Sequence, residues 1–150
     1  MTQLRVGLVG LGVMGRSHAR VLGSTEGVQL VGIADPAGDI FGAAGPATVV
    51  PDVEALIALG VDYAVVATPT RYHKENGLLL ADAGIPTLME KPLATDGPEA
   101  IRLTDAFESA GLVNGVGHIE RFNPALRALR DHLDAGDLGD IYQVATRSQG

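Results

Sequence analysis

The most constraining feature of the sequence is a strand-like run that passes directly into a glycine-rich turn. Residues 4–9 (LRVGLV) are mostly apolar and include β-branched valines, as expected of a buried parallel strand. Gly10, Gly12 and Gly15 follow in the pattern GxGxxG, and residues 13–22 then repeat apolar side chains at helical spacing. A strand joined to a helix by so short a turn predicts a βα unit and therefore a parallel sheet.

The rest of the chain repeats this alternation of strand and helix. Further strands are predicted at residues 28–34, 48–50, 62–68, 85–89 and 112–117, and helices at residues 52–59, 70–83, 97–110 and 123–135. A weak short helix followed by a loop is expected at 36–46, where Gly, Ala and Pro are frequent. The predicted fold class is α/β: a doubly wound, mostly parallel six-stranded sheet of Rossmann type, with helices on both faces.

Each glycine of the turn meets a different structural requirement. Gly10 permits the tight turn, Gly12 lets the backbone approach a ligand, and Gly15 lets the helix pack closely on the strand. The unpaired amides of Val13 and Met14, at the positive end of the helix, would then face a pyrophosphate. Because the chain contains 20 glycines, a glycine-rich turn that binds nothing is the alternative.

An aspartate supports the interpretation that the turn binds a dinucleotide. Asp35 closes the second strand about 20 residues after Gly15, where an acid meets the adenosine ribose in folds of this type. A carboxylate accepts hydrogen bonds from the ribose hydroxyls and repels a 2′-phosphate, so NAD is predicted as the cofactor and NADP is disfavoured. The alternative is an aspartate that only starts a turn before Pro36.

The C-terminal part of the chain fits the sheet less well. Six strands complete the sheet by about Gly117, so a strand predicted at 141–147 would be a seventh. We therefore expect an NAD-binding domain over residues 1–122. Residues 123–150 would be a linking helix and the first strand of a C-terminal α+β domain that continues beyond residue 150. An open strand edge tends to pair with another chain, and a homo-oligomer is expected at full length.

Composition excludes several other classes of protein. The chain has no cysteine, which excludes disulfides and thiolate chemistry and leads us to expect a cytoplasmic protein. A net charge of −7 without a basic run argues against a nucleic-acid partner. No apolar stretch approaches the ~18–20 residues that a membrane span requires. No metal-ligand spacing and no serine-hydrolase motif occurs in the sequence.

Two further motifs point to a particular family. Thr68 and Pro69 end the fourth strand, with His73 shortly after them, and Glu90-Lys91-Pro92 ends the fifth. Together with the glycine turn and His18, these residues resemble the glucose-fructose oxidoreductase/inositol dehydrogenase/MocA family of sugar-type dehydrogenases. Residues 117–124 (GHIERFNP) resemble the nucleotide-sugar dehydrogenases of that family, such as the UDP-N-acetylglucosamine 3-dehydrogenase type. The resemblance covers effectively the whole chain.

The resemblance implies an NAD-dependent oxidoreductase that transfers hydride between nicotinamide and a secondary alcohol of a sugar, polyol or nucleotide sugar. It implies that Lys91 borders the cofactor, orients the reacting hydroxyl and assists proton transfer, and that Glu90 lies near the nicotinamide ribose. The family's general base belongs to a second domain, in a motif beyond residue 150. This chain alone is therefore expected to be inactive.

The other candidate residues have two interpretations each. Ligands of doubly wound folds bind at the carboxyl ends of the strands, so one groove is expected to run past all of these motifs. His73 is assigned to the cofactor, with packing or capping as the alternative, whereas His18 is interpreted as structural. His118, Arg121 and Asn123 are candidate substrate residues, although Asn123 before Pro124 is also an ordinary helix start.

Two other functions remain open at this stage. A non-catalytic NAD(H)-binding or redox-sensing module would use the same glycine turn, but it would not need Lys91 at a strand end. A reductase of C–C or C=N bonds is the other possibility, because a cofactor-binding half does not identify the bond that is oxidised.

Overall fold

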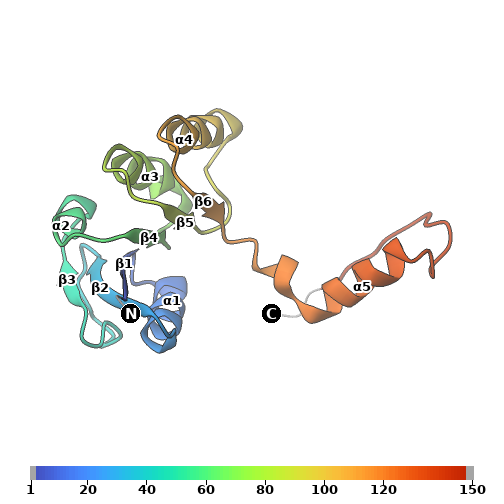
Figure 1. Cartoon of the computed structure of the whole chain (residues 1–150), viewed down its shortest axis with the longest axis horizontal. Coiled ribbons are helices and arrows are strands. Elements are labelled where there is room, and N and C mark those ends of the chain that lie inside the picture. The colour runs from blue at the N-terminus through green and yellow to red at the C-terminus, as the bar shows by residue number, and fades with distance from the viewer. Residues whose placement is uncertain (1–2, 148–150) are drawn as a thin grey trace. The chain divides into compact units, whose positions relative to one another are not determined.

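A computed structural model describes residues 3–147 (Figure 1). The chain divides into two compact units, Met1–Gly117 and His118–Gly150, and each is described by itself.

The first unit is a six-stranded sheet with helices between its strands. Its elements are β1 (Leu4–Val9), α1 (Val13–Ser24), β2 (Val28–Ala34), β3 (Thr48–Val50), α2 (Val53–Ala58), β4 (Tyr63–Val66), the 3-10 helix η1 (Thr70–Tyr72), α3 (His73–Asp82), β5 (Thr87–Met89), α4 (Gly97–Ser109) and β6 (Asn114–Val116). The strand order is β3-β2-β1-β4-β5-β6, and every neighbouring pair is parallel. The sequence-based prediction of a doubly wound parallel sheet is confirmed.

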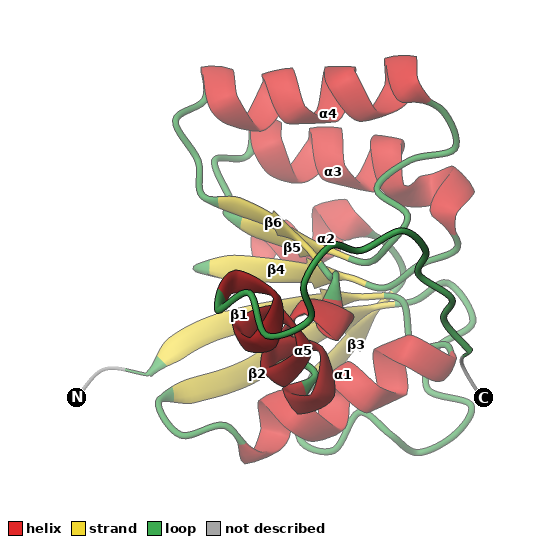
Figure 2. Ribbon diagram, turned by 90° about the vertical axis from the view of Figure 1, so that its right-hand side faces the viewer, coloured by secondary structure: helices red, strands yellow, loops and turns green. Residues whose placement is uncertain are grey.

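Helices cover both faces of this sheet, and each face has its own apolar core. Figures 1 and 2 show α1 on one side of the strands and α2, α3 and α4 on the other. The α1 core contains Val6, Leu8, Ala19, Leu22, Ile33 and Val65. The opposite core contains Val9, Leu56, Val66, Leu80, Met89, Leu103 and Phe107. Burial of each large aliphatic side chain stabilises the fold by about 1.5–3 kcal/mol, which holds the strand ends in fixed positions.

Side-chain caps and a glycine mark the helix boundaries. Asp52 precedes α2, and its carboxylate accepts a hydrogen bond from the Ala55 amide at 2.8 Å. Gly60 follows α2 with φ +74°, a left-handed conformation that favours glycine. Asp96 caps α4 in the same way through the Glu99 amide.

The helix predicted within 36–46 is wrong. This segment consists of turns and bends, and the carboxylate of Asp39 accepts hydrogen bonds from the amides of Ala43 and Ala44, both at 2.8 Å. A side chain that bonds to nearby amides offers the backbone an alternative to the helical pattern. The segment is therefore a compact turn.

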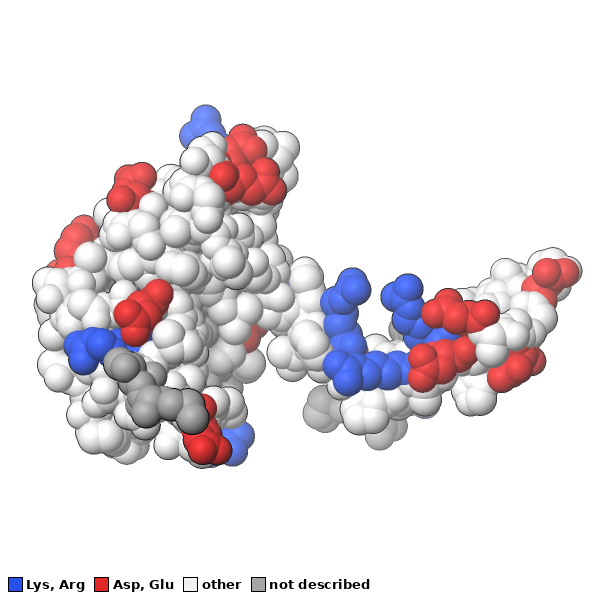
Figure 3. Space-filling model, viewed as in Figure 1, with Lys and Arg blue, Asp and Glu red and all other residues white. Residues whose placement is uncertain are grey.

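The second unit is mainly helical. It contains the 3-10 helix η2 (Ile119–Phe122) and α5 (Pro124–Asp134), and charged side chains of both signs lie along it (Figure 3). The strand predicted at 141–147 is wrong, since this segment has no regular secondary structure. A strand is stabilised by hydrogen bonds to a partner strand, and the described residues of this unit include none.

Among residues 3–147, no helix combines the length and the apolar character needed to cross a bilayer.

Candidate functional site

The glycine turn after β1 is shaped by two close backbone approaches. Gly10 has φ +93°, and its amide donates a hydrogen bond to the Ala34 carbonyl at 2.8 Å. A Cβ atom on Gly15 would lie 2.0 Å from the Gly10 carbonyl oxygen. Internal packing therefore requires glycine at both positions.

Gly12 has no such internal reason to be glycine. Its φ is −68°, which any residue adopts, and a Cβ atom built on it would meet nothing within 4 Å. The space in front of Gly12 is open in the protein itself. Close approach of a ligand to the backbone explains a glycine here, as the spacing predicts.

The start of α1 is arranged differently from the starts of α2 and α4. No side chain caps α1 within the part of the chain that the structure describes, and its first turn contains no acidic residue. By contrast, Asp52 and Asp96 cap α2 and α4. The amide end of α1, with the positive end of its dipole, is thus available to an anion such as a diphosphate.

Asp35 lies at the end of β2 and is bonded to the glycine turn. One carboxylate oxygen accepts a hydrogen bond from the Leu11 amide at 2.7 Å, and the other accepts from the Ala37 amide at 2.8 Å. The contact with the Ala37 amide is the one expected of an aspartate that starts a turn before Pro36. The Leu11 contact also joins the carboxylate to the turn, and each oxygen keeps a lone pair that can accept from a hydroxyl.

A cleft of about 470 Å³ connects these features. Gly10, Gly12, Asp35, Thr68 and Pro69 all line it, so the structure brings these predicted residues together. Its charged lining residues are all acidic: Asp35, Asp52, Glu54 and Glu75. The cleft therefore has room for an adenosine. Its negative charges disfavour an additional phosphate group on that adenosine.

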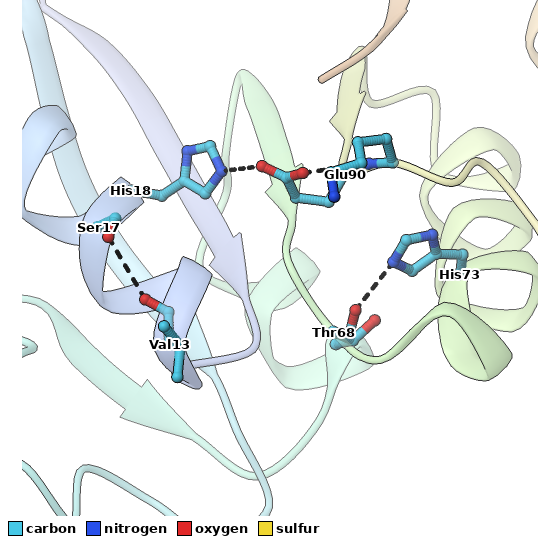
Figure 4. A network of polar contacts seen from close by, with 7 residues as sticks. Val13, Ser17, His18, Thr68, His73 and Glu90 are labelled. Carbon is cyan, nitrogen blue, oxygen red and sulfur yellow. Dashed lines mark hydrogen bonds and ion pairs between the residues drawn. The ribbon is translucent and has the colours of Figure 1, made fainter. Parts of the chain in front are cut away.

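Glu90 and His18 form a contact that sequence reasoning did not predict (Figure 4). Glu90 is only 6% exposed, and its Oε1 accepts a hydrogen bond from His18 Nε2 at 2.8 Å. Its Oε2 accepts from the Lys91 amide at 3.1 Å. His18 comes shortly after the glycine turn, and Glu90 comes at the end of β5. Their positions next to these two motifs are the one signal in the sequence that they meet at the same edge of the sheet.

Lys91 lies next to this pair and is exposed to solvent. Within residues 3–147 its ammonium group makes no hydrogen bond or ion pair. An unpaired ammonium at the carboxyl end of β5 is free to contact a ligand in the position where doubly wound folds bind them.

His73 is placed inside the protein. Its ring is 1% exposed, with Nε2 2.9 Å from the Thr68 carbonyl oxygen and Nδ1 3.0 Å from that of Pro92. His73 does not line the cleft. The packing alternative for this residue agrees with these contacts better than direct cofactor binding does.

The candidate substrate residues all belong to the second unit. His118 precedes η2, and Arg121 lies in it with an exposed side chain. Asn123 caps α5, since its Oδ1 accepts a hydrogen bond from the Ala125 amide at 3.0 Å. The ordinary helix-start interpretation of Asn123 is thus confirmed, and the substrate role of all three residues stays a prediction. The described residues contain no cluster of three His, Asp or Glu that could hold a metal.

Together, the glycine turn, the uncapped helix and the aspartate at the end of β2 define a dinucleotide-binding domain of Rossmann type. Residues 4–118 match the model of a family described as an oxidoreductase family with an NAD-binding Rossmann fold, GFO_IDH_MocA. The chain belongs to this glucose-fructose oxidoreductase/inositol dehydrogenase/MocA family, as its motifs predicted.

Similar proteins agree with the family. The chain is 35% identical over 148 residues to the rhizopine catabolism protein MocA of Rhizobium meliloti, covering 97% of this chain and 47% of MocA. It is 39% identical over 147 residues to inositol 2-dehydrogenase 4 of Saccharopolyspora erythraea, covering 91% of this chain and 43% of that protein. The chain thus spans a little less than half the length of these relatives.

Two solved structures show the same arrangement of elements. The WlbA dehydrogenase of Bordetella pertussis, in complex with NADH and UDP-GlcNAcA, superposes with a TM-score of 0.86 at 29% identity, over 94% of this chain and 42% of that one. The UDP-N-acetylglucosamine 3-dehydrogenase GnnA of Acidithiobacillus ferrooxidans superposes with a TM-score of 0.78 at 34% identity, over 87% and 44% of the two chains.

Proposed function

We propose that this chain is the cofactor-binding half of an NAD-dependent oxidoreductase that acts on a secondary alcohol of a polyol, sugar or nucleotide sugar. The family and the names of the relatives support the substrate class, since they include an inositol dehydrogenase and dehydrogenases of nucleotide sugars. With this proposal go two further expectations, a cytoplasmic location and a homo-oligomer of the complete enzyme.

The observation that carries the proposal is the open space at Gly12 beside a fixed carboxylate. The turn keeps a glycine where the protein's own packing does not require one, and Asp35 is bonded to the same turn through the Leu11 amide. A diphosphate beside the amide end of α1 and a ribose beside Asp35 would use both features at once.

The residues at the end of β5 would serve the reaction. A bound nicotinamide supplies the hydride acceptor. Lys91, whose ammonium is unpaired in the described residues, would orient the substrate hydroxyl and hold a proton at Nζ. Glu90 would hold the backbone of Lys91 through the amide contact at 3.1 Å. A sensor that only bound NAD(H) would not need this arrangement.

The test is a titration of NADH and NADPH into the purified chain, in which binding is measured by nucleotide fluorescence or by calorimetry. Because the charged lining of the cleft is entirely acidic, NADH should bind at least tenfold more tightly than NADPH, a difference of about 1.4 kcal/mol. Equal affinities would remove Asp35 from its proposed role, and no binding of either nucleotide would contradict the proposed function.

A further inference from the structure

The imidazole of His73 connects two loops that follow different strands. Its Nε2 lies 2.9 Å from the carbonyl oxygen of Thr68, in the turn after β4, as Figure 4 shows. Its Nδ1 lies 3.0 Å from the carbonyl oxygen of Pro92 and 3.2 Å from that of Leu93, in the segment after β5. One side chain at the start of α3 thus contacts both loops.

The loops that His73 contacts carry the residues proposed to act in the site. Thr68 lines the cleft, and Pro92 and Leu93 follow Lys91 directly. A displacement of the Pro92 carbonyl would therefore move the backbone of Lys91. The ring is 1% exposed, so water does not replace a lost contact at little cost.

A second side chain of α3 holds the segment after β5 at a point closer to α4. Lys74, the residue after His73, pairs with Glu99, and Thr95 also donates a hydrogen bond to that carboxylate. The segment between Lys91 and α4 is thus held near its start by His73 and near its end by Lys74. On the other side of Lys91, Glu90 is held by His18.

We propose that His73 is a positioning residue for Lys91: it holds the segment after β5 against the turn after β4 and so fixes where the lysine side chain begins. This inference rests on the proposed function, because it concerns the residue that would move the proton. His73 itself does not line the cleft. Its effect is transmitted through the backbone of Pro92 and Leu93.

Two conservative substitutions separate the two contacts. The amide nitrogen of asparagine takes the place of Nδ1, and that of glutamine takes the place of Nε2. His73→Asn therefore places a donor toward Pro92 and Leu93, and His73→Gln places one toward Thr68. Both variants lose one contact of the pair, and they differ in which loop remains held.

The first measurement uses the purified chain and hydrogen exchange of its backbone amides. In His73→Gln, the amides of Lys91 and Glu99, which donate to Glu90 Oε2 and Asp96 Oδ1, should exchange at least tenfold faster than in the unsubstituted chain, whereas in His73→Asn they should change less than threefold. Ile33→Val, a substitution in the core on the α1 face of the sheet, serves as a control that lowers stability, since no residue of 91–96 packs against that core. NADH affinity should change less than threefold in His73→Gln, which keeps the contact with Thr68 at the edge of the cleft.

The second measurement is turnover in the complete enzyme. His73→Gln should lower kcat at least tenfold with KM for NAD within threefold, and His73→Asn should recover most of kcat. Equal losses in the two variants, or a greater loss in His73→Asn, overturn the proposal. Failure of both variants to fold also overturns it, because His73 would then be required for the fold itself.

Failure of the proposed function gives a different result. An unsubstituted chain that binds no NADH would contradict the function whatever the variants do. The exchange difference between His73→Asn and His73→Gln would still show which loop the histidine holds.

Discussion

His18 Nε2 donates a hydrogen bond to Glu90 Oε1 at 2.8 Å, across a sequence separation of 72 residues. His18 belongs to α1, whose first turn would bind the diphosphate, and Glu90 follows β5 directly. Since the other oxygen of Glu90 accepts from the Lys91 amide, this pair links the two ends of the proposed site. The helix proposed to bind the diphosphate and the segment that carries Lys91 are therefore connected by side chains.

His18→Phe should destabilise the chain by about 1–3 kcal/mol, the usual cost of leaving a buried polar group without its partner. The side chain of Glu90 is 8% exposed, so water does not readily replace the histidine. Glu90→Gln should cost less, because its amide still forms a hydrogen bond with the ring. Urea unfolding followed by circular dichroism measures the free energies.

A matched control exists on α5. His132 Nδ1 lies 2.8 Å from Asp137 Oδ2, the same separation, but these side chains are 63% and 56% exposed. His132→Phe should change stability by less than about 1 kcal/mol, because both side chains of this contact are exposed to solvent. Equal losses for His18→Phe and His132→Phe would show that burial of Glu90 does not strengthen its contact.

Gly12→Ala and Gly15→Ala should separate ligand binding from folding. A methyl group on Gly12 meets no protein atom within 4 Å, so stability should change by less than about 1 kcal/mol. NADH affinity should fall at least tenfold, about 1.4 kcal/mol, because the methyl group occupies the approach to the turn.

Gly15→Ala should behave in the opposite way. Its methyl group would lie 2.0 Å from the Gly10 carbonyl oxygen, and the necessary backbone shift should cost about 1–3 kcal/mol of stability. Thermal unfolding and NADH titration of both variants make the comparison. Unchanged NADH affinity in Gly12→Ala would mean that the turn does not bind the diphosphate.

Local patterns were sufficient to predict most of the fold, whereas contacts between distant residues were not predictable. The turn from Gly10 to Gly15, the cap at Asp52 and the stop at Gly60 each depend on neighbours a few residues away, so the sequence contained their signals. The contact of His18 with Glu90 depends on where α1 and β5 meet in space. The spacing of residue types along the chain does not show where these two elements meet.

The wrong predictions have the same origin. Residues 141–147 have a strand-like composition, but a strand forms only with a partner, and the described part of the second unit has none. Composition predicts a weak short helix followed by a loop at 36–46, where Gly, Ala and Pro are frequent, yet the Asp39 carboxylate accepts hydrogen bonds from two amides and favours a turn. The contact of His73 with the cofactor stays a prediction, and only the three-dimensional structure shows that its ring lies inside the protein.

Asp39 should make stability depend on pH in the acidic range. Hydrogen bonds from the Ala44 and Ala43 amides hold the pKa of its carboxyl below the ordinary value of 3.8. A group whose pKa is lower in the folded state stabilises the protein above its unfolded pKa. This contribution is lost as the pH falls through the lower, folded pKa.

Asp39→Asn provides the comparison for this effect. The stability difference between the unsubstituted chain and Asp39→Asn should be constant near neutral pH and should shrink as the pH falls below about 3.8. Urea midpoints measured at a series of pH values test this. A difference that stays constant down to about pH 2.5 would contradict the role of the charged carboxylate in the turn.

Lys91→Ala should leave folding and NADH binding unchanged and should abolish turnover in the complete enzyme. The side chain is exposed, and its ammonium has no partner within residues 3–147. Its removal therefore leaves no buried group without a partner, and stability should change by less than about 0.5 kcal/mol. Lys91→Arg separates charge from proton transfer, because a guanidinium keeps the positive charge but does not give up its proton at neutral pH. If Lys91 only orients the hydroxyl, the arginine variant should recover part of the turnover; if it also moves the proton, the arginine variant should stay as inactive as alanine. Turnover that survives in Lys91→Ala would exclude both roles, since a residue that orients the substrate or transfers its proton cannot be removed without slowing the chemical step.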